Sequence, residues 1–169
     1  MKEFTLVSRG FAWCDHISVQ LFLEKKCDKL ILHLPSRLND KKNAFIDDTY
    51  GRRLNDWHRV FSSKLNINSI QEIGQAINTE GCRFFYDEYG MKTSSRMMII
   101  ESFFMIGFSD SNENEPTKGY TKYTWDRFQH KESNRIHVKL NPVIKKIQGN
   151  IPVLRSSNKK RTRKRKIEE

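Results

Sequence analysis

The chain has 169 residues, 37% of them hydrophobic and 30% charged, which is enough for one ordinary domain and a tail. Eleven Phe, five Tyr and three Trp exclude a wholly disordered chain, and no apolar stretch approaches the length of a transmembrane helix. The net charge is +11, the start of the chain lacks the apolar run of a signal peptide, and three cysteines without a CxxC spacing exclude a compact zinc site. This composition predicts a soluble, basic, intracellular protein without a membrane partner.

Short β-prone runs alternate with amphipathic segments along most of the chain. The expected strands are residues 4–8, 30–34, 82–86, 103–108 and 135–140, and the expected helices are residues 15–25, 52–65, 69–78, 95–102 and 121–130. Asp15 is the expected N-cap of the first helix, Ser69-Ile-Gln-Glu72 has the form of a capping box, and residues 36–51 are expected to be loop.

This alternation predicts an α/β fold with a Rossmann-like, mainly parallel sheet and helices on both faces. The apolar run at residues 103–108 is the strongest candidate for a buried strand. Ligands of such sheets bind at the carboxyl ends of the strands. The segments of interest therefore follow the strands, at residues 8–15, 35–37, 87–95 and 109–121.

Four short motifs follow one another along the chain, each at the end of an expected strand or the start of an expected helix. The first is Ser8-Arg-Gly-Phe-Ala-Trp-Cys-Asp15, and the later ones are Leu32-His-Leu-Pro35, Met105-Ile-Gly-Phe108 and Gly119-Tyr-Thr-Lys-Tyr-Thr124. In this order they resemble the SLOG superfamily, the Rossmann-like group of DNA-processing and LOG-type proteins. The resemblance spans about residues 4–140 and implies binding of nucleotides, nucleotide-derived signals or DNA.

The resemblance also implies a set of ligand-contacting residues. Glycine-rich turns at helix N-termini expose backbone N–H groups, and the helix dipole there stabilises phosphate. Carried over residue by residue, the ligand site would contain Ser8, Arg9, Gly10, Asp15, Arg96, Gly119 and Thr121. Neither a metal nor a resident cofactor is expected, and no P-loop sequence is present.

Several positions depart from the family pattern. Arg9, Trp13 and Tyr120 stand where the family has glycine, Ser94-Ser95 replaces an Arg-Asn pair with Arg96 one step later, and no Glu follows Thr121 as in LOG enzymes. A side chain at a glycine position fills space that a ligand would need. We therefore predict a diverged member of the superfamily that lacks catalytic activity.

More than half of the excess charge lies at the C-terminus. Residues 155–169 contain eight basic and two acidic side chains, so this segment is predicted to be a disordered basic tail, joined through a linker at 141–154 to a domain at 1–140. The tail residues expected to contact nucleic acid, or to direct nuclear import, are Lys159, Lys160, Arg161, Arg163, Lys164, Arg165 and Lys166. Solvation alone is the alternative role.

Three functional hypotheses follow. The first is a binding module for a nucleotide-derived ligand or nucleic acid, in which Arg9, Arg52, Arg53, Arg96 and the tail contact phosphate. The second is a nucleotide or nucleoside-phosphate hydrolase whose site contains Ser8, Asp15, Asp87 and Thr121. The third is a structural protein, by analogy a homodimer, whose rim aromatics Phe11, Trp13 and Tyr120 contact a partner.

Overall fold

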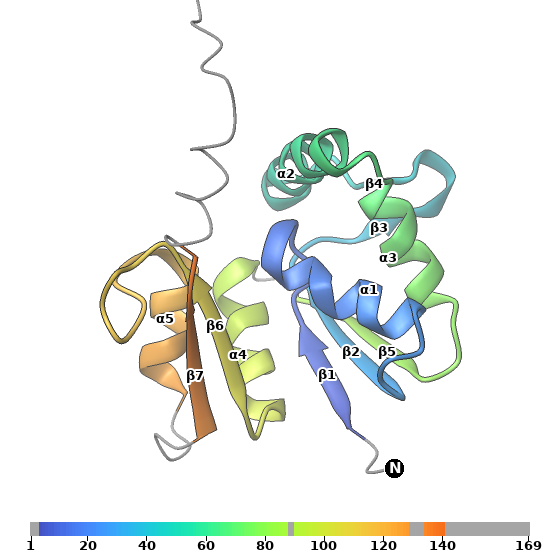
Figure 1. Cartoon of the computed structure of the whole chain (residues 1–169). Coiled ribbons are helices and arrows are strands. Elements are labelled where there is room, and N and C mark those ends of the chain that lie inside the picture. The colour runs from blue at the N-terminus through green and yellow to red at the C-terminus, as the bar shows by residue number, and fades with distance from the viewer. Residues whose placement is uncertain (1–3, 88–89, 129–133, 141–169) are drawn as a thin grey trace, which may run out of the picture.

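Two separate parallel sheets form the framework of the mixed α/β fold. The computed structural model describes residues 4–87, 90–128 and 134–140 (Figure 1). The first sheet has the strand order β1-β2-β5, and the second is the pair β6-β7. The strands are β1 (Thr5–Ser8), β2 (Lys29–Leu34), β5 (Cys82–Tyr86), β6 (Met105–Ser109) and β7 (Arg135–Lys139).

Five helices connect these strands. They are α1 (Ile17–Leu23), which follows the short 3-10 helix η1 (Trp13–His16), and α2 (Thr49–Leu65), α3 (Ser69–Ile77), α4 (Met91–Glu101) and α5 (Gly119–Arg127). The predicted α/β class with parallel strands is confirmed. The single predicted sheet is not observed, because β1 pairs only with β2 and β6 only with β7 among the described residues.

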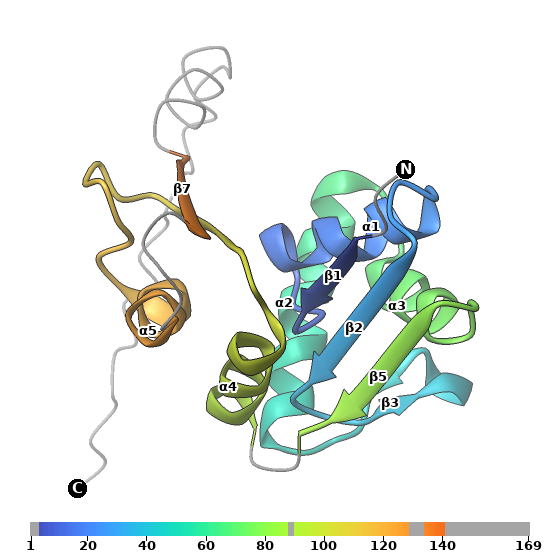
Figure 2. The same ribbon diagram turned by 90° about the horizontal axis from the view of Figure 1, so that it is seen from below.

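Helices α1 and α3 cover one face of the first sheet, and α4 lies on the opposite side (Figure 2). Alternate side chains of β2 point to the two faces. Leu30, Leu32 and Leu34 are fully buried and form the main core together with residues of α1 and α3. His33 points the other way, toward Glu101 at the end of α4.

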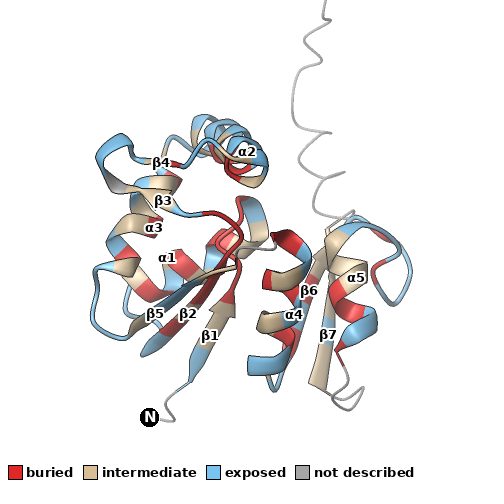
Figure 3. Cartoon of the chain, turned by 180° about the vertical axis from the view of Figure 1, so that it is seen from behind, coloured by how far each residue is buried: buried red, intermediate tan, exposed pale blue. Residues whose placement is uncertain are grey.

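Among the residues that the structure describes, the second sheet is covered on one face only. Met105 packs with Trp125 and Phe128, and a Cβ at Gly107 would lie 3.2 Å from the Trp125 ring, so this face of β6 rests on α5. Ile106 points to the other face and is 54% exposed. No residue of β7 is buried (Figure 3).

The prediction of a fully buried strand at residues 103–108 is therefore wrong. Phe103 is 74% exposed and precedes the strand, which begins at Met105. A continuous apolar run is typical of a strand covered on both faces. Here β6 is at the edge of a two-stranded sheet with one helical cover, so its alternate side chains remain in solvent.

Several predicted boundaries also change. The segment at 36–51 contains an antiparallel hairpin, β3 (Leu38–Asn39) and β4 (Ala44–Phe45), with the 3-10 turn η2 (Asp40–Lys42) between them. Helix α2 begins at Thr49, because the Asp48 side chain accepts a hydrogen bond from the backbone N–H of Gly51.

The capping box is also wrong. The N-cap of α3 is Asn68, whose Oδ1 accepts from the Gln71 N–H at 3.2 Å. Ser69 is fully buried and bonds His58, while Glu72 bonds His16. The predicted linker at 141–154, the tail at 155–169 and residues 129–130 of the last predicted helix lie outside the described residues.

Candidate functional site

The carboxyl ends of β1 and β6 lie at one end of a cavity of about 660 Å³ between the two sheets. Its walls include β1, α1, the end of α4, β6 and α5. Ser8, Arg9 and Asp15 line it from the first strand-to-helix turn, and Thr121 and Thr124 line it from α5. The fold thus brings together two segments that are more than a hundred residues apart in sequence.

The turn after β1 is closed by its own hydrogen bonds. The Ser8 hydroxyl donates to the Asp15 carbonyl at 2.8 Å and accepts from the Gly10 N–H at 3.2 Å. Gly10 has φ +64°, and a Cβ there would lie 2.6 Å from the Leu34 side chain, so this position requires glycine. Trp13 also has positive φ, +69°, although it is a bulky residue.

Arg9 is the central charged group of this turn. Its guanidinium donates to the Asp15 carboxylate through Nε at 2.9 Å and through Nη2 at 3.2 Å, and to the Ser95 hydroxyl through Nη1 at 3.0 Å. Arg9 is only 6% exposed and also lies over the Phe11 ring, 4.5 Å from its centroid. The Arg9–Asp15 pair is a two-pronged charged hydrogen bond within the turn, and the bond to Ser95 ties the turn to α4.

This arrangement corrects two expectations about the turn. Asp15 lies inside η1, and no side-chain cap bond is present at either η1 or α1, so Asp15 is not an N-cap. Its carboxylate accepts from Arg9 instead, because the arginine brings a fixed fork of donors within reach. Arg9 is accordingly not a free cation at the cavity.

Two buried histidines support the turn from behind. His58 of α2 bonds the Gly10 carbonyl through Nε2 at 3.0 Å and Ser69 Oγ through Nδ1 at 2.9 Å. Burial and the neighbouring His16 lower the pKa of His58 to about 4. His16 Nε2 lies 2.6 Å from Glu72 Oε2, and burial lowers its pKa as well.

Aromatic residues connect the turn to the start of α5. The Phe11 ring centroid lies 5.9 Å from that of Trp57 and 6.5 Å from that of Tyr120. Phe11 was expected to be a rim residue that contacts a partner. It is buried and belongs to the main core instead. Trp13 is 46% exposed and packs against Phe61 of α2.

Helix α5 starts with an open turn. Gly119 has φ +73°, and nothing lies within 4 Å of a Cβ placed on it. Its N-cap, Lys118, makes no side-chain cap bond to the first turn. Thr121 lines the cavity, while the Thr124 hydroxyl donates to the Tyr120 carbonyl at 2.8 Å.

Four predicted site residues do not line the cavity: Gly10 and Gly119, which lie in the two turns already described, and Arg96 and Asp87, which lie elsewhere. Arg96 is exposed on α4 and does not line the cavity, since its neighbour Ser95 faces Arg9. Asp87 follows β5 and lies 3.6 Å from His33 Nδ1, while Glu101 lies 3.4 Å from His33 Nε2. Burial raises the pKa of Asp87.

Ser95 and His58 contact the turn after β1 but were not among the site residues expected from the sequence. His58 had a recognisable signal, because Leu54, His58 and Phe61 follow the spacing of one helix face and all three are buried. Ser95 had none, since its role depends on a guanidinium that approaches from a turn 86 residues earlier.

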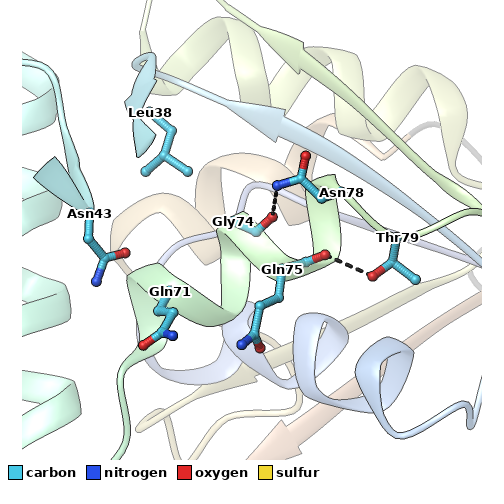
Figure 4. Close-up of a pocket in the computed structure, with 7 residues that line it drawn as sticks. All are labelled: Leu38, Asn43, Gln71, Gly74, Gln75, Asn78 and Thr79. Carbon is cyan, nitrogen blue, oxygen red and sulfur yellow. Dashed lines mark hydrogen bonds between the residues drawn. The ribbon is translucent and has the colours of Figure 1, made fainter. Parts of the chain in front are cut away.

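A second cavity of about 460 Å³ lies between the β3–β4 hairpin and α3 (Figure 4). Two polar side chains of its lining already form hydrogen bonds with the backbone of α3. The Asn78 amide donates to the Gly74 carbonyl and the Thr79 hydroxyl to the Gln75 carbonyl, both at 2.8 Å. No charged side chain lines it. This cavity therefore serves as a comparison for the site and not as a candidate.

The described residues hold no group of three or more His, Cys, Asp or Glu side chains arranged to bind a metal ion. Across the same part of the chain, no helix is long and apolar enough to cross a membrane.

Comparison with known proteins finds a relative of viral origin. No family model matches the chain, and no solved structure matches it. The uncharacterized protein R261 of Acanthamoeba polyphaga mimivirus is 33% identical over 138 residues, which cover 82% of this chain and 72% of the mimivirus protein. The chain belongs to the family of this mimivirus protein.

Proposed function

We propose that this protein is a Rossmann-like, SLOG-type binding module that holds a phosphate-bearing, nucleotide-derived ligand in the cavity between β1 and β6. The main support is the meeting of two strand-to-helix turns at the carboxyl ends of parallel strands, with Phe11 in ring contact with Tyr120. Ligands of open α/β sheets bind at such edges. The SLOG resemblance of the same two turns agrees with this position.

The α5 side of the cavity offers donors for an anion, while the charged residues of the lining are Arg9, Asp15 and Glu101. The first N–H groups of a helix have no partner within the helix and attract negative charge, and α5 begins with a glycine that leaves its surroundings open. The Thr121 hydroxyl adds a donor on the same wall. A phosphate at this turn would find backbone donors, a hydroxyl and, across the cavity, an Arg9 guanidinium that it would share with Asp15.

The origin of the positive charge differs from the family pattern. The resemblance leads one to expect an Arg-Asn pair where Ser94-Ser95 stands. The Arg9 guanidinium donates to Ser95 from the turn after β1. We infer that Arg9, which occupies a glycine position of the family, brings a guanidinium to the place beside α4, where Asp15 balances its charge.

The engagement of Asp15 favours binding over hydrolysis. A general base must accept a proton from the nucleophile, and both oxygens of Asp15 already accept from Arg9. Asp87, the other acid of the hydrolase hypothesis, faces His33 and does not line the cavity. The catalytic alternative therefore has no free carboxylate among its named residues.

Isothermal titration with inorganic phosphate, AMP, ADP, ATP and ADP-ribose tests the proposal. Thr121→Val removes one hydroxyl at nearly constant volume and should weaken binding about tenfold, the equivalent of one lost hydrogen bond. Thr79→Val, in the comparison cavity of Figure 4, is the matched control and should leave affinity unchanged. No binding by any compound, or equal affinities for Thr121→Val and the native chain, would contradict the proposal, and turnover would favour the hydrolase.

Contact of the basic tail with nucleic acid is a separate part of the proposal. It depends on the composition of residues 155–169, which lie outside the described residues. Phosphate neutralisation by Lys and Arg makes binding steeply dependent on salt. An affinity for duplex DNA that stays constant from low to high salt would exclude this role.

A further inference from the structure

Large apolar side chains form much of the wall of the cavity between the two sheets. They come from the start of β1, from α1, from the link between α4 and β6, and from β6 itself. Those in most contact with solvent, each at least 36% exposed, are Phe4, Ile17, Leu21, Phe103, Phe104 and Ile106. They are six of the fourteen exposed large hydrophobic residues in the described part of the chain. Exposed apolar surface is thus concentrated at this cavity, and such a concentration marks a binding groove.

The smaller cavity of Figure 4 has a different lining. Its seven lining residues include one large apolar side chain, Leu38, and the others are Asn, Gln, Gly or Thr. An apolar wall is therefore not a general property of the depressions on this protein. It belongs to the cavity that α1, β1 and β6 surround.

The apolar wall is elongated. All four residues of β1 (Thr5–Ser8) and residues 105–108 of β6 line the cavity, which corresponds to roughly 10 Å along each strand. From α1, Ile17 and Leu21 line it about one helical turn apart. A narrow ligand that lies along the strands would contact all three walls, and a hydrocarbon chain has this shape.

The chemistry of this wall favours a hydrocarbon over a base or a sugar. Ile17, Leu21, Phe104 and Ile106 carry no side-chain donor or acceptor. Polar groups placed among them would lose their hydrogen bonds to water without replacement by these side chains. A methylene chain has no such bonds to lose, and it covers apolar surface that otherwise contacts water. The volume of about 660 Å³ lies within the range of small-molecule sites.

Polar groups line the same cavity at the two strand-to-helix turns. Arg9 and Thr121 lie there, beside the open first turn of α5. Glu101, a further charged residue of the lining, has its Oε2 3.4 Å from Nε2 of the buried His33. The cavity therefore combines donors for an anion with an apolar wall, and an amphiphile matches both.

We propose that the cavity binds a phosphate ester of a single hydrocarbon chain, with the chain between α1, β1 and β6 and the phosphate at the α5 turn. The inference deepens the proposed function and rests on it for the position of the phosphate. The position of the chain depends only on the apolar wall. A free lipid phosphate and a nucleotide esterified with a chain share this chemistry.

Isothermal titration of the native chain with hexyl, octyl and decyl phosphate, at concentrations where they stay monomeric, tests the chain. Each methylene that enters the apolar wall should raise the affinity by up to about fourfold, so decyl phosphate should bind at least about tenfold more tightly than hexyl phosphate. Equal affinities would overturn the inference, and the proposed function would still stand if inorganic phosphate or a nucleotide binds.

Two further ligands separate the chain from its head group. Decanol that binds as tightly as decyl phosphate would support the chain site and contradict the phosphate site. The decyl ester of AMP distinguishes the two sources of the ligand. Tighter binding of this ester than of decyl phosphate would assign the nucleotide source, and the reverse order would assign the lipid source.

Ile106→Thr and Ile136→Thr locate the chain. The two residues are register partners on β6 and β7 and are 54% and 50% exposed, but only Ile106 lines the cavity. Ile106→Thr should weaken the binding of decyl phosphate about fivefold and leave that of inorganic phosphate unchanged, while Ile136→Thr should change neither. Threonine keeps the β-branch of isoleucine, so both variants remain suited to a strand. Equal affinities of the two variants for decyl phosphate would overturn the placement of the chain.

The native cysteines give a readout that needs no substitution. Cys14 lines the cavity and Cys82 does not, and both are half-buried. Bound decyl phosphate should slow the alkylation of Cys14 by iodoacetamide, measured by peptide mass spectrometry, and leave that of Cys82 unchanged. Equal protection of both thiols, or protection of neither, would overturn the inference.

Discussion

Acidification should destabilise the turn after β1 through His58. This side chain is fully buried, and its ring bonds the Gly10 carbonyl and the Ser69 hydroxyl. In the neutral form Nε2 donates to the carbonyl and Nδ1 accepts from the hydroxyl. A second proton would place a charge in the core beside His16, whose ring centroid is 5.9 Å away.

The pKa values set the size and the pH window of the effect. The pKa of His58 falls from 6.5 to about 4 on folding, so the unfolded chain binds the proton more tightly. The folded state is therefore favoured fully above the unfolded pKa and loses stability as pH falls from about 6.5 toward 4. Linkage gives a loss of about 2 kcal/mol between pH 7 and pH 5 from His58 alone.

Urea unfolding at pH 7, 6 and 5 measures this loss, and His58→Gln isolates it. Glutamine retains an N–H donor for the Gly10 carbonyl but does not titrate. Its free energy of unfolding is expected to be lower at pH 7 and to depend less on pH, by about 2 kcal/mol over this range. His16 and Asp87 titrate in both proteins and cancel in the comparison. Identical pH dependence in both proteins would refute the assignment.

Three further predictions concern the site and the tail. Asp15→Asn should lower the free energy of unfolding by about 2–3 kcal/mol, because it leaves a buried guanidinium without its counter-charge, whereas Asp47→Asn in an exposed ion pair should cause no measurable change in a urea titration. Gly10→Ala should reduce stability more than Gly119→Ala, since both positions have positive φ but only Gly10 has a side chain within 3 Å of the new Cβ. Removal of residues 155–169 should reduce the slope of log affinity for DNA against log salt by up to about 5.

The strands were largely predictable from local pattern, but their joint arrangement was not. Residues 82–86 form β5 as predicted, and β1, β2 and β7 match within one residue at each end. A run such as 103–108 indicates an apolar strand without indicating how many of its faces are covered. Cover depends on tertiary neighbours, and within the described part of the chain β6 has a helix on one face only.

The site shows the same limit at the level of single side chains. Sequence reasoning placed Ser8, Asp15 and Thr121 near one another, and all three line one cavity. It assigned Asp15 to a helix cap because capping is a local interaction that a sequence pattern can indicate. The actual partner, Arg9, also bonds a residue of α4, and such a long-range bond has no local signature.

Arg9 and Trp13 stand in the turn after β1 at the two positions where the SLOG resemblance has glycine. Trp13 has a left-handed backbone there, φ +69°, although it carries a large ring. The ring packs outward against Phe61 and does not line the cavity. Arg9, at the other replaced glycine of this turn, folds inward instead and forms part of the cavity wall. Of these two side chains, only Arg9 therefore borders the space open to a ligand, and Asp15 already balances its charge. A ligand phosphate at this wall would have to share the guanidinium with that carboxylate, which favours ligands whose remaining phosphate contacts come from the α5 turn.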